Sequence, residues 1–370
     1  MKKKVLAVLL GGCMVAGLVA GCGSKDDGKA TDGGDSGEGG GGYHFEVVVK
    51  SFQSTYWQAA ITGVDEKAEE LGVTVNKTGP NAESDIADQV QMLNNAINQN
   101  PDGIALAANS QDAVLEALQT ALDKEIPVVC FDTGVPDAPE GSVIATIATD
   151  NEAAGAVAAE NMYEVIKDTI ANATEPVRIG EVNQDATSAN ISGRGMGFIN
   201  KMKELIEADG KTVAVVGNQY YVDQVENNGD EGSADVIIEV AVPAQTTVEL
   251  SSTEASNIMT KKDTIAIFGS NQVTAEGVLT ANQNLSVLAA TPEDGIVGVG
   301  FDAGATLKAA VADGTLIGAV TQAPVDQGSL AIQALYDYCE GKEVKDIATD
   351  SYWYDAENME DEDIAPNLYD

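Results

Sequence analysis

Apolar and polar positions alternate in a regular way along most of the chain, and residues 296–324 show the unit clearly. Residues 296–301 are a short apolar, β-branched run that predicts a buried strand. Residues 303–312 carry apolar side chains at helical spacing, with Leu307, Ala310 and Val311 on one face. A second apolar run follows at 316–320. A strand–helix–strand crossover predicts two parallel strands that are buried on both faces.

The same alternation runs from residue 43 to about residue 349. Further strands are expected at 45–49, 73–75, 103–108, 127–131, 143–148, 177–182, 213–216 and 264–269. Helices are expected at 57–71, 82–98, 112–124, 153–170, 188–208, 252–259, 273–283 and 327–340. This alternation predicts an α/β fold with two doubly wound, mostly parallel sheets, because the pattern restarts near Asp150.

Two segments break the rhythm. Residues 220–240 contain two β-rich runs around a polar, acidic stretch, which predicts a hairpin insertion. Residues 350–370 predict an irregular acidic tail with packed aromatic side chains.

The N-terminus predicts a targeting segment and a tether. Residues 1–22 combine three lysines with an apolar stretch and end in Leu-Val-Ala-Gly-Cys22, which resembles the lipobox of bacterial lipoproteins. The resemblance implies acylation of Cys22; a plain cleaved signal peptide is the alternative. Residues 23–42 are rich in Gly, Ser and Asp and predict a flexible tether.

Composition narrows the functional class. The chain has 370 residues, enough for two domains, and 20 basic against 59 acidic residues give a net charge of −39. That charge disfavours binding to nucleic acid or to anionic lipid. Cys130 and Cys339 are expected to be buried free thiols, with a disulfide between them as the alternative.

Polar side chains follow many of the predicted strands. Because ligands bind at the carboxyl ends of the strands in open α/β sheets, these side chains should meet in one cleft. The candidate ligand-binding residues are Ser54, Tyr56, Trp57, Asn109, Asp132, Thr133, Arg194, Asn271, Asp302 and Gln322. For Asp302 and for Asn109 the alternative role is capping of the following helix.

The chemistry of this set suits a neutral ring rich in hydroxyl groups, which is a sugar. Asp132 precedes a Thr-Gly-Val-Pro stretch that forbids an immediate helix, so helix capping explains it poorly. Arg194 lies between glycines and offers a two-pronged donor, whereas Arg178 opens a strand and is expected to be exposed. Tyr56 and Trp57 offer flat apolar faces that can cover a ring.

These residues resemble a known family, the type I periplasmic binding proteins of sugar ABC transporters, in particular the ribose and galactose binders. The resemblance covers residues 43–349 and rests on segments 51–57, 127–132, 149–151, 194–198, 267–271, 299–302 and 321–324. It implies two lobes joined by hinges near Asp150, Gln322 and Thr349. Ribose binders carry Arg where this chain has Thr133, and an aromatic residue where it has Thr246. Tyr220 or Tyr221 is the candidate replacement for that aromatic, and the identity of the sugar stays open.

The resemblance also sets the expected boundaries and partners. The N-terminal lobe should comprise 43–149 plus 323–349, and the C-terminal lobe 150–322 plus 350–370. The function implied is a solute-binding lipoprotein that delivers a monosaccharide to the permease and ATPase of an ABC importer. It would be a monomer, held by its lipid on the extracellular face of the cytoplasmic membrane. The alternatives are a sensor of a sugar-like signal that docks on a receptor or kinase, or a binder of a nucleoside or another small polar ligand.

An enzyme is disfavoured, because His44 is the only histidine and lies near the tether, which makes a Ser–His or Cys–His nucleophile a poor expectation. The acidic stretch within 220–240 does not match the register of a calcium loop. No cofactor and no metal are expected.

Overall fold

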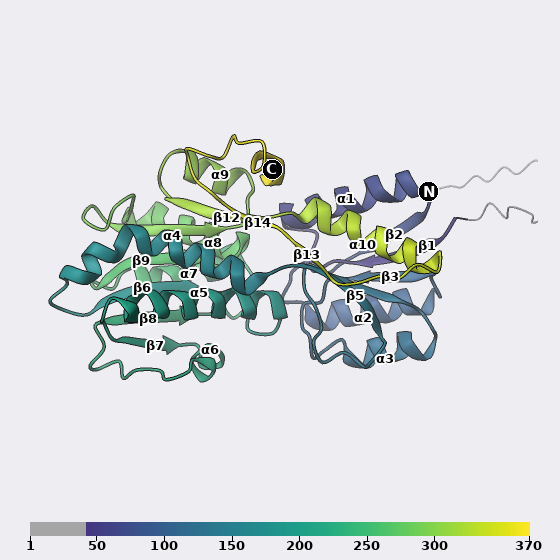
Figure 1. Ribbon diagram of the computed structural model, residues 1–370, viewed down its shortest axis with the longest axis horizontal. Helices are drawn as coiled ribbons and strands as arrows, with labels where there is room; N and C mark the ends of the chain where they lie inside the picture. Colours follow the sequence, from purple (N-terminus) through teal and green to yellow (C-terminus); the bar gives the residue numbers. More distant parts are fainter. Residues whose placement is uncertain (1–41) are drawn as a thin grey trace, which may run out of the picture. The chain divides into compact units, whose positions relative to one another are not determined.

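Two parallel-stranded sheets flanked by helices make up residues 42–370, the part of the chain that the computed structural model describes (Figure 1). The predicted leader, Cys22 and nearly all of the tether lie outside these residues. Among residues 42–370, no helix has the length and apolar character needed to cross a membrane.

The first sheet has six strands, all parallel, in the order β13-β5-β4-β3-β1-β2. Its strands are β1 (His44–Val48), β2 (Thr74–Thr78), β3 (Gly103–Leu106), β4 (Val128–Phe131), β5 (Val143–Thr149) and β13 (Ile347–Thr349). Helices α1 (Thr55–Leu71) and α10 (Pro324–Cys339) cover one face of it. Helices α2 (Ile86–Asn98) and α3 (Leu115–Asp123) cover the other face.

The second sheet has eight strands, with a main order of β14-β12-β11-β9-β6-β8-β7 and β10 paired to β11. Its strands are β6 (Val177–Val182), β7 (Val213–Gly217), β8 (Val236–Ala241), β9 (Thr264–Gly269), β10 (Leu288–Ala289), β11 (Ile296–Phe301), β12 (Gly318–Gln322) and β14 (Ser351–Tyr354). Only β14 runs antiparallel to its neighbour, β12.

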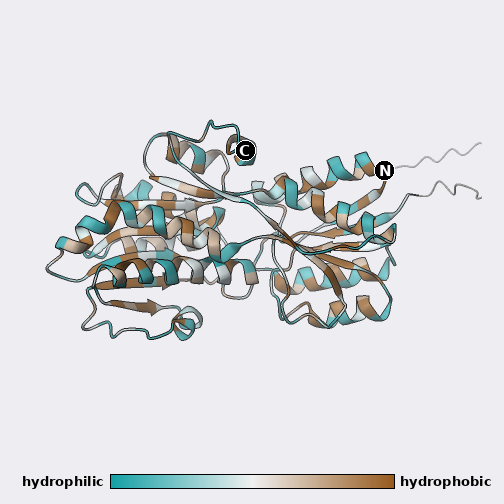
Figure 2. Ribbon diagram, viewed as in Figure 1, coloured by the Kyte–Doolittle hydropathy of each residue, from teal (hydrophilic) through white to brown (hydrophobic). Residues whose placement is uncertain are grey.

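Helices cover both faces of the second sheet too. Helices α4 (Asn151–Asn172) and α5 (Ala189–Ala208) pack on one face. Helices α7 (Val248–Met259), α8 (Gln272–Leu285) and α9 (Ala305–Ala312) pack on the other. The strands carry the hydrophobic colour in Figure 2, as expected for sheets enclosed on both sides.

The chain crosses between the two sheets three times. The crossings lie between β5 and α4, between β12 and α10, and between β13 and β14. They fall at Asp150, Ala323 and Asp350, next to the positions that the sequence predicted for hinges. The α/β fold with two parallel sheets and three crossings is therefore confirmed.

The prediction of a hairpin at 220–240 is wrong. A short helix, α6 (Gln219–Gln224), and a loop occupy most of this segment, and β8 follows. Strand β8 pairs with β7 in parallel, so the segment is one more β/α crossover of the second sheet.

Three smaller expectations also need correction. The tail is not wholly irregular, because β14 extends the second sheet and a turn of 3₁₀-helix, η1, forms at Ala365–Asn367. Arg178 is buried rather than exposed, because it pairs with Glu239 at 2.7 Å and with Asp263 at 3.1 Å. Cys130 and Cys339 are free thiols, as expected, which excludes the disulfide, but Cys339 is only half-buried where burial was expected.

Candidate functional site

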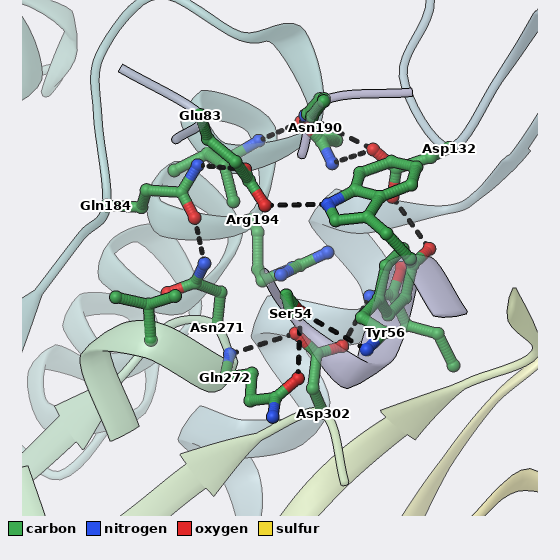
Figure 3. Close-up of a pocket in the computed structure, with 15 residues that line it drawn as sticks. Ser54, Tyr56, Glu83, Asp132, Gln184, Asn190, Arg194, Asn271, Gln272 and Asp302 are labelled. Carbon is green, nitrogen blue, oxygen red and sulfur yellow. Dashed lines mark hydrogen bonds and ion pairs between the residues drawn. The ribbon is translucent and has the colours of Figure 1, made fainter. Parts of the chain in front are cut away.

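A pocket lies where strand ends of the first sheet face strand ends of the second (Figure 3). Its lining includes most of the candidates that the sequence singled out, namely Ser54, Tyr56, Trp57, Asp132, Arg194, Asn271, Asp302 and Gln322. It also includes residues absent from that set: Lys50, Glu83, Gln184, Asn190, Ile191, Gln272 and Val273. Lining residues come from both halves of the chain, so the site exists only where the two sheets meet.

Two aspartates occupy corresponding places on the two sheets. Asp132 follows β4 and Asp302 follows β11, and both have left-handed backbone, with φ of 62° and 74°. The N–H of each donates across to the neighbouring strand, Asp132 to Ile147 O at 2.9 Å and Asp302 to Val320 O at 2.7 Å. This backbone region is uncommon outside glycine but is tolerated by Asp. It turns each carboxylate out of the strand pattern and into the pocket.

Asp132 sits in a buried set of polar partners drawn from both halves. The Tyr56 hydroxyl donates to one carboxylate oxygen at 2.7 Å, and Asn190 Nδ2 donates to the other at 2.8 Å. The ammonium of Lys50 lies 3.2 Å from the same carboxylate and donates to Asn190 Oδ1 at 2.9 Å. Lys50 is 1% exposed, so its charge balances that of Asp132 inside the protein.

Asp302 does not cap the helix that follows it, so that alternative is wrong. Its Oδ1 accepts from Gln322 Nε2 at 2.6 Å, and its Oδ2 accepts from the backbone N–H of Gln272 at 3.0 Å. Burial raises the pKa of Asp302, although the charge of Arg194 acts in the opposite direction. Gln322 Oε1 is buried and has no hydrogen-bond partner in the described part of the chain, so it is available to accept from a ligand hydroxyl.

Arg194 is held from three sides. Its Nη2 donates to Asn151 Oδ1 at 2.7 Å, its Nη1 donates to Ser270 O at 2.8 Å, and its guanidinium lies 3.6 Å from the centre of the Phe301 ring. Gly155 of α4 lets the backbone of α5 approach closely at this point, because a Cβ there would lie 2.1 Å from the backbone oxygen of Arg194. The guanidinium is therefore fixed in direction and balances the charge of Asp302 without a direct ion pair.

The aromatic pair lies at one wall. The Tyr56 and Trp57 rings meet edge to face, with centroids 5.0 Å apart, and both side chains are almost fully buried. Trp57 Nε1 donates to Glu83 Oε1 at 2.7 Å, and Gln184 Nε2 donates to Glu83 Oε2 at 2.6 Å. Burial raises the pKa of Glu83.

Direct hydrogen bonds between the two halves close the pocket. Ser54 Oγ donates to Gln272 Oε1 at 3.0 Å, and the bond from Gln184 Nε2 to Glu83 Oε2 also joins the two halves. Within the second half, Asn271 Nδ2 donates to Gln184 Oε1 (Figure 3). The free space inside is about 20 Å³, room for roughly one water molecule. An adjoining chamber of about 420 Å³ shares Ser54 and Gln272 with the pocket and is lined beyond them by Thr246 and Glu276.

Some candidates do not line the pocket, and these expectations are corrected. Asn109 Nδ2 donates to Lys50 O at 3.3 Å, and Thr133 Oγ1 accepts from the Asn190 N–H at 3.2 Å, so both support lining residues from behind. Tyr221 is buried and donates to Asp185 O at 2.7 Å, and Tyr220 packs edge to face on it. Neither tyrosine stands in for the aromatic side chain that Thr246 lacks.

The sequence gives only weak indications that the additional lining residues belong to the site. Lys50 follows β1 by two residues and Gln184 follows β6, so both continue the pattern of polar strand ends. Glu83 lies in the loop before α2 and Asn190 in the first turn of α5, where nothing in the sequence separates a ligand contact from a solvated side chain. No cluster of three His, Cys, Asp or Glu side chains suited to a metal ion occurs within residues 42–370.

The fold and the pocket define a class: a solute-binding protein of the type I periplasmic binding fold, with its site between two α/β halves. Comparison with known proteins agrees. A family model described as a periplasmic binding protein domain matches residues 45–343, and the chain belongs to that family. The resemblance to its sugar-binding group is confirmed, and membership makes the chain a binding protein rather than an enzyme. The family works outside the cytoplasm.

Two solved structures align along nearly their whole length. One is described as an ABC transporter, LacI family transcriptional regulator from Brachyspira murdochii, with 31% identity, a TM-score of 0.73, and coverage of 89% of this chain and 99% of that one. The other is an ABC transporter solute-binding protein from Agrobacterium vitis with bound D-fucose, with 26% identity, a TM-score of 0.73, and coverage of 88% and 100%.

A curated relative matches over a shorter stretch. The D-allose-binding periplasmic protein of Escherichia coli (strain K12) is 30% identical over 116 residues, which is 30% of this chain. The alignment spans 37% of the length of that relative.

Proposed function

We propose that this protein is a lipid-anchored solute-binding protein that takes up a neutral monosaccharide in the pocket and delivers it to an ABC importer. The observation that carries the proposal is the matched pair of buried aspartates, one presented by each sheet, with balancing cations. Asp132 faces Lys50 at 3.2 Å, and the charge of Arg194 acts on Asp302.

A neutral polyol suits this charge balance better than an ion does. Carboxylates accept from ligand hydroxyls, while ammonium and amide groups donate to ligand oxygens. The unpartnered Oε1 of Gln322 adds an acceptor that a hydroxyl would satisfy. A wrong stereoisomer would leave such a buried group unpaired, at a cost of about 1–3 kcal/mol. The bound D-fucose of one similar structure and the D-allose named for the curated relative support a monosaccharide.

Ligand entry requires the two halves to separate, because the closed pocket has only about 20 Å³ of free space. The three crossings at Asp150, Ala323 and Asp350 are the covalent links at which such a hinge would act. Ligand hydroxyls would then replace bonds between the halves such as Ser54 to Gln272 and Gln184 to Glu83. The permease would recognise the closed form.

The proposal places the protein as a monomer on the extracellular face of the cytoplasmic membrane, anchored through Cys22. Incorporation of labelled fatty acid tests the anchor: the wild-type chain should be labelled and the Cys22→Ala variant should not. A labelled Cys22→Ala variant, or an unlabelled wild type, would contradict it.

The ligand is tested by a thermal-shift screen of the detergent-purified full chain against D-allose, D-fucose, other monosaccharides, nucleosides and amino acids. A ligand at about 100 times its dissociation constant stabilises by roughly 2.7 kcal/mol, which gives a readable shift. A response confined to one or two sugars supports the proposal. A response to nucleosides or amino acids alone would keep the fold and refute the sugar.

A further inference from the structure

The peptide unit that follows Asp302 is held by two tyrosine hydroxyls from the end of the chain. The Tyr354 hydroxyl donates to Asp302 O at 2.8 Å. The N–H of Ala303, in the same peptide unit, donates to the Tyr369 hydroxyl at 3.2 Å. The carbonyl oxygen and the N–H of one peptide unit therefore bond to side chains 52 and 66 residues further along the chain.

Each tyrosine is itself firmly placed. Tyr354 is fully buried on β14, paired with Ala319 of β12. The backbone around Tyr369 is fixed by three bonds: Gly304 N to Tyr369 O at 3.0 Å, Lys308 Nζ to Leu368 O at 3.1 Å, and Thr321 Oγ1 to Asn367 O at 2.8 Å. The second half of the site thus carries a support built from residues 351–370.

The corresponding peptide on the first sheet is held differently. There the N–H of Thr133, which follows Asp132, closes a local turn onto Phe131 O at 2.7 Å. At Asp302 the equivalent N–H goes to Tyr369 instead. Left-handed backbone at a non-glycine residue persists only where the surroundings enforce it. The local turn holds the backbone in this conformation at Asp132, and the two tyrosines hold it at Asp302.

Tyr369 also reaches the opposite side of the pocket. Its ring meets that of Tyr56 edge to face, with centroids 6.0 Å apart, and it packs against the core of the first sheet. Tyr56 in turn donates to Asp132 at 2.7 Å. One C-terminal side chain thus contacts a lining residue of the first half and the backbone beside Asp302 of the second.

We propose that Tyr354 and Tyr369 are positioning residues that hold the Asp302–Ala303 peptide in place and thereby aim the Asp302 carboxylate into the pocket. That the carboxylate then binds ligand rests on the proposed function. That the tyrosines set its position does not.

Hydrogen exchange of the detergent-purified full chain tests the positioning without any ligand. The amide of Ala303 reports the Tyr369 bond, and the amide of Gln272 reports the carboxylate, because it donates to Asp302 Oδ2 at 3.0 Å. Tyr369→Phe and Tyr354→Phe are compared with Tyr352→Phe, a control on the same strand whose hydroxyl bonds the exposed Asp350 at 3.1 Å.

We expect both amides to exchange at least about tenfold faster in Tyr369→Phe and Tyr354→Phe, and to keep wild-type rates in Tyr352→Phe. Faster exchange at Ala303 alone would overturn the proposal, because the carboxylate would then hold its position without the tyrosines. Unchanged exchange at both amides would overturn it too. If one variant fails to fold, the other decides.

Calorimetric titration with D-fucose and D-allose measures whether the same substitutions change sugar binding. For a sugar that binds the wild type, we expect about tenfold weaker binding by Tyr369→Phe and wild-type affinity for Tyr352→Phe. If Asp302→Asn bound that sugar as well as the wild type, the proposed ligand role of Asp302 would fail, while hydrogen exchange would still decide the role of the tyrosines.

Discussion

Asp302→Asn should weaken ligand binding and at the same time stabilise the unliganded protein at neutral pH. The substitution keeps the shape of the side chain, and one oxygen remains to accept from the Gln272 N–H. The new amide can donate to Gln322 Oε1, which has no partner in the described chain, once the Gln322 amide turns over. The fold should therefore survive.

The magnitude for binding follows from the charge. A hydrogen bond to a charged group is worth about 1.5–3 kcal/mol, so replacing the carboxylate by a neutral amide should raise Kd by roughly 10–150-fold. Calorimetric titration with the sugar found in the screen measures this, and Asp313→Asn, an exposed aspartate at the end of α9, is the control. A Kd within twofold of wild type, with the fold intact, would refute the reasoning.

The stability effect has a defined pH dependence. Burial raises the pKa of Asp302 in the folded protein, so the folded state holds its proton more tightly than the unfolded state does. The wild type should therefore lose stability as pH rises from about 4, the unfolded value, through the raised pKa. Denaturant titrations at several pH values should show a shallower decline for Asp302→Asn. If stability fell equally with pH in the wild type and in Asp302→Asn, the raised pKa would not belong to Asp302.

Three further perturbations test other buried groups. Lys50→Met leaves Asp132 without its cation, so urea unfolding should show a free energy of unfolding lower by about 3–5 kcal/mol. The double variant Lys50→Met with Asp132→Asn should recover much of this loss. Equal losses in the single and double variants would contradict the pairing of Lys50 with Asp132. Burial raises the pKa of Glu181 well above its usual value, and Glu181 Oε2 has no hydrogen-bond partner in the described chain. The stability of Glu181→Gln relative to wild type should therefore increase as pH rises from 4 to 8. The exposed control Glu66→Gln should show no such increase. Burial raises the pKa of the Cys130 thiol to about 12, so maleimide should label Cys130, located by mass spectrometry, only on unfolding; rapid native labelling would show that the thiol is accessible.

The sequence was a good guide wherever periodicity spans a whole element. Apolar stripes long enough to define a period located the long helices to within a few residues, as for α5, expected at 188–208 and found at Ala189–Ala208. The six residues of α6 are too few to define a period, so the segment around them looked like a hairpin. Strand β14 was missed because Ser351–Tyr354 consists mostly of aromatic residues and does not alternate between apolar and polar side chains.

The site was predictable to the extent that it lies at strand ends. Asp132 and Asp302 were found because each directly follows a buried strand. The pairing of Lys50 with Asn190 could not be predicted, since it depends on how two separate sheets face each other across the pocket. The role of Tyr369 could not be predicted either. Its hydroxyl bonds Ala303, 66 positions away, and the segment around Tyr369 has no periodicity.

The three crossings have a consequence for the order in which the protein can fold. Helix α10 completes the core of the first sheet beside α1, yet the two helices begin at residues 324 and 55. Strand β14 and its buried Tyr354 complete the second sheet only after residue 350. A chain emerging from the ribosome therefore exposes unfinished apolar faces on both halves until almost all of it has been made. Such late, non-local contacts fold slowly, so nearly the whole chain must be made before the pocket between the two halves can exist.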